Sequence, residues 1–134
     1  MISKLMKKKN QKGFTLMEML IVIAIIAVLV AIMIPTMTSQ LENARESADA
    51  ANIRSIYAEA MVKYITTGEA VNEAGTDTDY QYTLTQKNDG WDNTELETAL
   101  GNLGDVTGDV KKGGTCTIKV SDTGDATIAF TAGS

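Results

Sequence analysis

The strongest pattern in the chain is an uninterrupted apolar run near its N-terminus. Residues 19–34 are sixteen apolar residues in succession, and the 21 residues from Phe14 to Ile34 include one charged side chain, Glu18. A helix of that length is about 31 Å long at ~1.5 Å per residue, which matches a bilayer core of roughly 30 Å. A buried core helix is the alternative, but a chain of 134 residues is too small to enclose a helix that is apolar on every side. The run therefore predicts a membrane-spanning helix.

Helical periodicity continues after Pro35, over residues 37–66. Pro35 removes one backbone donor and crowds the preceding turn, which predicts a kink or a locally melted segment. Beyond it, apolar residues recur at intervals of three and four, typical of an amphipathic helix: Met37, Leu41, Ala44, Ala48, Ala51, then Ile53, Ile56, Tyr57, Ala60, Met61 and Tyr64. Charged residues lie between these positions, among them Glu42, Glu46 and Asp49. The first part of the apolar stripe is mostly alanine, which lets another backbone approach closely.

Residues 67–134 predict a small head of strands and one short helix. Alternating apolar positions predict a strand at 80–86 and two more around residues 116–120 and 128–130, the last two joined by a hairpin turn. A surface loop is predicted at residues 69–79, and a helix at 92–103 capped by Asp92 or Thr94. The expected fold class is α+β, with a long N-terminal helix packed against a small antiparallel sheet. The head's sheet is expected to cover the apolar stripe of residues 37–66.

Charge and composition limit the classes of function that the chain can have. Residues 1–13 carry five lysines and no acid, whereas the rest of the chain carries seven basic and 17 acidic groups, a net charge of −10. The basic start predicts a cytoplasmic N-terminus, and the acidic remainder disfavours nucleic-acid binding. The chain has no histidine and one cysteine, so His-dependent catalysis, His-ligated metals and an intrachain disulfide are excluded. We therefore expect neither an enzyme nor a cofactor.

Three other features have alternative interpretations. Oxygen-rich loops at 76–79, 88–93, 105–109 and 122–125 suit either solvated turns or calcium, although none has the EF-hand pattern. Solvated turns are the favoured interpretation. Cys116 is expected to be a buried apolar residue rather than a nucleophile. Trp91, beside a turn, is either a core anchor or an exposed adhesive residue.

A specific motif precedes the apolar run. Residues 12–18 read Lys-Gly-Phe-Thr-Leu-Met-Glu, and an ordinary secretory signal would instead have its cleavage site after the run. Together with the apolar helix and Pro35, this motif resembles the class III signal of type IV pilins and type II secretion pseudopilins. The resemblance is close over residues 8–36 and extends in general design to residue 66. For the head, we recognise no related family.

The resemblance implies how the chain is processed. A prepilin peptidase would cut between Gly13 and Phe14 and methylate the new amine of Phe14. Glu18 would pair with the N-terminal amine of a neighbouring subunit, and the helix would loosen at Pro35 during assembly. From physics alone, Glu18 could instead be a solvated residue at the lipid headgroups, since a carboxylate deeper in a spanning helix is costly. The expected parts are a leader at 1–13, a transmembrane helix at 14–36, an amphipathic helix at 37–66 and the head at 67–134.

The resemblance also implies a function. The chain would be a structural subunit of an extracellular type IV pilus serving adhesion, motility or surface colonisation. It would be a single-pass protein of the cytoplasmic membrane before assembly, and its partners would be further copies, the peptidase, and the assembly platform with its ATPase. The alternative is a pseudopilin of a type II secretion or competence system. The absence of proline after Pro35 disfavours the major secretion pseudopilin. A minor pilin and a single-pass membrane enzyme with an acidic head are further alternatives, both less favoured.

Overall fold

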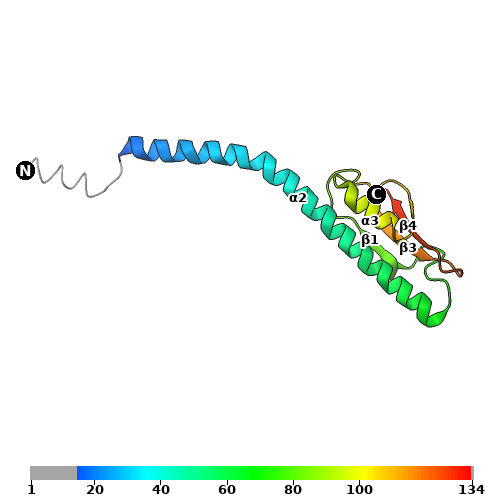
Figure 1. Cartoon of the computed structure of the whole chain (residues 1–134). Helices are drawn as coiled ribbons and strands as arrows, with labels where there is room; N and C mark the ends of the chain where they lie inside the picture. Colours follow the sequence, from blue (N-terminus) through cyan, green and yellow to red (C-terminus); the bar gives the residue numbers. More distant parts are fainter. Residues whose placement is uncertain (1–14, 134) are drawn as a thin grey trace, which may run out of the picture. The chain divides into compact units, whose positions relative to one another are not determined.

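The computed structural model describes residues 15–133, and a single long helix dominates it (Figure 1). Helix α2 spans Leu16–Thr67, 52 residues, and continues through Pro35 without a locally melted segment. The chain divides into two compact units between Ser39 and Gln40. The predicted leader and Phe14 lie outside the described residues. The predicted end of the helix, near residue 66, is confirmed.

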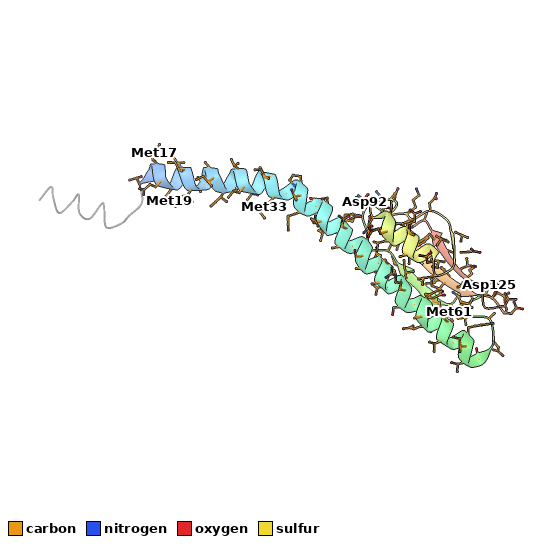
Figure 2. All side chains as sticks on the ribbon, in the orientation of Figure 1. Met17, Met19, Met33, Met61, Asp92 and Asp125 are labelled. Atoms are coloured by element: carbon orange, nitrogen blue, oxygen red, sulfur yellow. The ribbon has the colours of Figure 1, made fainter. Side chains whose placement is uncertain are left out.

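The part of α2 that belongs to the first unit is exposed over its whole described length. All side chains from Thr15 to Leu41 are exposed, including every large apolar one. Figure 2 shows Met17, Met19 and Met33 projecting outward from the ribbon. By length and composition, α2 can cross a membrane. The predicted apolar spanning segment is therefore a helix with no protein core around it.

The second unit contains a four-stranded sheet in the order β1-β3-β4-β2. Its strands are β1 (Gln81–Thr83), β2 (Asp105–Thr107), β3 (Thr115–Val120) and β4 (Ala126–Thr131). β3 pairs antiparallel with both β1 and β4, as predicted, and the β3–β4 hairpin has the predicted connection. However, β2 was not predicted, and it runs parallel to β4. The fold class is thus α+β with a mixed sheet rather than a purely antiparallel one.

The core of the second unit lies between α2 and one face of the β3–β4 hairpin. Register places Ile118 opposite Ile128 and Cys116 opposite Phe130, so their side chains share a face. Ile53 and Ala60 of α2 pack into the same core, together with Leu100 from helix α3 (Thr94–Gly101). In Figure 1 the sheet and α3 lie along one side of this part of α2. The predicted contact between the sheet and the later part of the apolar stripe is therefore confirmed.

Several predicted boundaries in the head shift for identifiable reasons. The strand expected at 80–86 ends at Thr83, because the amides of Thr85 and Gln86 donate to the Asp49 carboxylate of α2 and not to a neighbouring strand. A short 3-10 helix, η1 (Thr78–Tyr80), precedes this strand. Asn93 caps α3 by accepting from the amide of Glu95, so the predicted caps Asp92 and Thr94 are wrong.

The predicted surface loop at 69–79 is also partly wrong. Val71 within it is buried and forms an isolated antiparallel bridge with Val120, through two backbone bonds of 2.8 and 2.9 Å. This bridge ties the segment after α2 to the sheet.

Candidate functional site

The first turn of α2 holds Glu18 through a reciprocal pair of hydrogen bonds. The Thr15 amide donates to Glu18 Oε2 at 3.1 Å, and the Glu18 amide donates to Thr15 Oγ1 at 3.3 Å. Because α2 begins at Leu16, Thr15 is its N-cap residue, and the pair forms a capping box. The carboxylate is also favourable next to the positive end of the helix dipole. Glu18 therefore holds the start of the helix, and Thr15 is a site residue that the sequence analysis did not single out.

The other predicted site residues are less constrained by the structure. Gly13 and Phe14 lie outside the described residues, so the pairing of Glu18 with an N-terminal amine stays a prediction. Pro35 lies inside the continuous helix. Directly after it, the hydroxyls of Thr36 and Thr38 donate to the carbonyls of Ile32 and Ile34, one turn back, at 3.2 and 2.9 Å. These bonds supply extra partners to carbonyls in a turn where proline removes a backbone donor. The predicted role of Pro35 in assembly also stays a prediction.

The second half of α2 carries a row of buried carboxylates. Glu42 is 4% exposed, and Glu46 and Asp49 are completely buried. They lie at spacings of four and three residues, so they share one face of the helix with Ile53. The assignment of these acids to the polar side of an amphipathic helix is therefore wrong. These three acids face the head.

Backbone amides of the head satisfy these carboxylates. Glu42 Oε1 accepts from the amides of Lys87 and Asn88, each at 2.7 Å, while its Oε2 lies 3.3 Å from Arg45 Nη1. Glu46 accepts from the amides of Asp92 and Asn93, at 2.8 and 3.1 Å. Hydrogen bonds to an ionised acceptor are stronger than neutral ones, which offsets the cost of burying the charge.

Asp49 is the most heavily bonded of the three. It accepts from the amides of Thr85 and Gln86 at 3.0 Å, from the Thr85 hydroxyl at 2.6 Å and from the Tyr82 hydroxyl at 2.9 Å. Burial raises the pKa of Tyr82, and the neighbouring Asp49 carboxylate raises it further. Burial also tends to raise the pKa of Glu42, but its two amide donors and Arg45 outweigh this and lower it. The carboxylate of Glu42 is thus stabilised in its charged form.

An apolar stripe remains exposed on the opposite face of the same half. It consists of Leu41, Ala44, Ala48, Ala51, Ala58, Val62 and Ile65. The head's sheet therefore covers the later part of the predicted stripe, and the predicted members up to Ala51 are exposed. The small side chains on this face leave the backbone of α2 open to close approach.

The remaining candidate residues belong to the head. Cys116 is 1% exposed, and burial raises the pKa of its thiol to about 12, so the predicted apolar role is confirmed. Trp91 is half-buried, and its ring packs edge-on against Phe130 with the centroids 6.4 Å apart, which favours the core-anchor interpretation. Within residues 15–133, no group of three or more acidic or cysteine side chains is arranged to hold a metal ion.

The N-terminal part of the chain, which includes the first half of α2, is similar to known proteins. Residues 8–34 match the family model of the prokaryotic N-terminal methylation motif. The chain is 51% identical over 55 residues to the type IV narrow pilus major component PilA5 of Thermus thermophilus. It is also 51% identical over 39 residues to the type IV wide pilus major component PilA4 of the same organism. No solved structure matches it.

These matches have a limited extent. They cover 39% and 29% of this chain and 47% and 30% of the two relatives, so the chain spans less than half of the relatives it matches. The chain thus has a pilin-like α+β fold and the methylation motif of a class III signal. Over the matched residues, it is similar to the major components of two type IV pili of Thermus thermophilus.

Proposed function

We propose that this protein is a structural subunit of an extracellular type IV pilus. The observation that carries this proposal is the first half of α2, whose apolar side chains are all exposed and most of which lies within the methylation motif at residues 8–34. Such a helix needs lipid around it, or other helices of the same kind. Exchange of lipid for neighbouring subunits lets one segment serve first as an anchor and then as the filament core.

Processing makes the subunit ready for assembly. A prepilin peptidase cuts between Gly13 and Phe14 and methylates the new amine of Phe14. Glu18 then lies one turn from this amine, close enough in depth to pair with the amine of an adjacent subunit. Opposite charges attract strongly in a medium of low dielectric constant, and an apolar helix has little else to set its height in lipid. Before this pairing forms, the hydrogen bond from the Thr15 amide holds the Glu18 carboxylate at the start of the helix.

The life cycle follows from this assignment. The subunit resides in the cytoplasmic membrane as a single-pass protein, and it then joins a homopolymer outside the cell. The assembly platform and its ATPase are its other partners. The exposed stripe from Leu41 to Ile65 faces away from the head. It therefore extends the surface available to neighbouring subunits beyond the spanning segment.

A pseudopilin of a secretion or competence system is the second candidate, since the methylation motif belongs to both groups. The relatives favour the pilus, because both are named as major components of type IV pili. A gene for a retraction ATPase beside this one would support the pilus further.

The test is a pair of substitutions at Glu18. Glu18→Ala and Glu18→Gln should insert and be cleaved normally but yield little filament, because both remove the charge. Glu59→Gln is the control, since Glu59 is an exposed acid on the same helix. The measurement compares filament in a shear fraction with processed subunit in the membrane. Wild-type filament yields from both Glu18 variants would mean that Glu18 is only a headgroup-level residue.

A further inference from the structure

The segment from Thr85 to Asn93, here called the strap, is attached to α2 in an unusual way. Six of its backbone amides donate to three carboxylates of one helix face, in consecutive pairs. Asp49 takes the first pair, Glu42 the second and Glu46 the third. Figure 2 labels Asp92, whose amide belongs to the third pair, where the chain enters α3. The carboxylates thus fix the strap along two turns of the helix.

The strap is also braced within itself and at its far side. The Gln86 side-chain amide donates to the carbonyls of Asn88 and Gly90, which closes the turn between them. The Gly90 amide donates to the carbonyl of Val110, and Asp89 accepts from the amide of Lys112, each at 2.9 Å. The strap can therefore keep its shape and its tie to residues 110–112 when its bonds to α2 are lost.

Beyond these carboxylates, the core of the contact between α2 and the head is apolar. At its margins, Asn52 donates to the Tyr82 hydroxyl, the Tyr64 hydroxyl donates to the carbonyl of Asp122, and Lys63 lies over the Tyr80 ring. Ile53 and Ala60 pack with the β3–β4 hairpin in the core, and none of these side chains titrates. The contact with α2 therefore has a part that depends on pH, the carboxylates with the strap, and a part that does not, the apolar packing with the β3–β4 hairpin. Acid changes the carboxylate half and leaves the apolar half intact.

We propose that the strap is an acid-released clasp, which leaves α2 when its three carboxylates are protonated while the sheet stays packed on the helix. A protonated carboxyl keeps one good acceptor oxygen and gains a donor, but at Glu46 two amide donors face it. One amide would then be buried without a partner. Opening the clasp returns these groups to water.

The other charged and titratable groups around the carboxylates are few. Arg45 faces Glu42, and the Tyr82 hydroxyl of β1 faces Asp49. The strap's own charged side chains, Lys87, Asp89 and Asp92, are exposed. Among residues 15–133, no ion pair joins Glu46 or Asp49 to a cation. Amide donors therefore hold the charges of these two acids, and water replaces such donors readily once the strap opens.

Hydrogen exchange on the full chain in detergent micelles tests the clasp. At pH 7, Glu46→Gln should reduce the protection of the Asp92 and Asn93 amides by about tenfold, since a charge-assisted bond is worth ~1.5 kcal/mol or more. The side chain keeps its size but offers one acceptor instead of two. The control is Glu59→Gln, which should change nothing. Protection of Ile118 and Ile128 should stay within about twofold of wild type in both variants.

Acid titration of the wild-type protein tests the same clasp without any substitution. Trp91 is the only tryptophan and lies in the strap, so its emission reports on the entry of water into the strap. Between pH 7 and pH 3, strap amides should lose protection, corrected for intrinsic rates, before the sheet does. Simultaneous loss in strap and sheet would overturn the proposal, because it would mean global unfolding. So would a strap that stays protected at pH 3.

Discussion

Replacing Ile53 by alanine tests the central contact between the long helix and the head. Ile53 is completely buried, and it packs from α2 into the core formed with the β3–β4 hairpin. Truncating such a side chain costs about 2–5 kcal/mol through lost burial and the cavity left behind. A domain of this kind has a total stability of about 5–15 kcal/mol, so the variant should lose a substantial share of it.

The size of the thermal effect follows from the size of the unit. The second unit runs from Gln40 to Ser134, 95 residues, for which 1 kcal/mol corresponds to roughly 4–8 °C in Tm. Ile53→Ala should therefore lower Tm by at least about 8 °C. Ile65→Ala is the matched control, because the same side chain on the same helix is 75% exposed there. It should shift Tm by less than about 4 °C, since exposed substitutions rarely exceed ~0.5 kcal/mol.

The assay is a melting curve of the full chain in detergent, followed by Trp91 fluorescence. Trp91 packs against Phe130 and reports on the head, whereas circular dichroism would be dominated by the spanning helix, which detergent keeps folded. Equal shifts for the two isoleucine variants would refute the assignment of the buried and exposed faces of α2. No shift for Ile53→Ala would show that the apolar contact does not stabilise the head.

Three further predictions concern single residues. Cys116 should resist thiol reagents at pH 8 in the folded head and react once the head is denatured, because its pKa is raised to about 12. Glu42→Gln should lower the free energy of unfolding at pH 7 but not at an acidic pH below the lowered pKa of Glu42. The pKa of Glu42 is lower in the folded protein than in the unfolded chain, so its carboxylate stabilises the fold fully above the unfolded-chain pKa. This stabilisation is lost as the pH falls through the folded-state pKa. Denaturant titrations of wild type and variant at both pH values measure the difference. Gly13→Leu should leave an uncut precursor in the membrane, and mass spectrometry that finds Phe14 as its first residue would contradict the predicted cleavage.

The sequence predicted those parts of the fold that follow from periodicity. Ile53 and Ile118 occupy apolar positions at helical and strand spacing, and both are buried in the core. Strand β2 lacked any such signal, because it has three residues and all of them are exposed. Glycines allow its parallel pairing: a Cβ at Gly108 would overlap the carbonyl oxygen of Phe130 on β4. Such close backbone approach depends on tertiary structure, and a pattern of apolar positions does not record it.

The candidate site was predictable to different degrees. The Thr-x-x-Glu pattern of Thr15 and Glu18 is a known sign of a helix start, so the capping box could be predicted from the sequence. The burial of Glu46 was not predictable, because an acid on an amphipathic helix is usually solvated. Only the amides of a segment some 46 residues further along the chain make its burial favourable. A local pattern cannot predict a contact across that separation.

The way in which α2 holds the strap also bears on how the surface of this protein can change. Lys87, Asn88 and Asp92 contact the helix through their main chains, while their side chains are exposed. Recognition of the main chain is indifferent to the identity of the side chain. Mutation can therefore alter the outer chemistry of these positions without weakening the attachment. Proline is the exception, since it has no amide to donate. The strap is thus a part of the protein's surface whose side chains can vary in sequence while its backbone keeps the same position on α2.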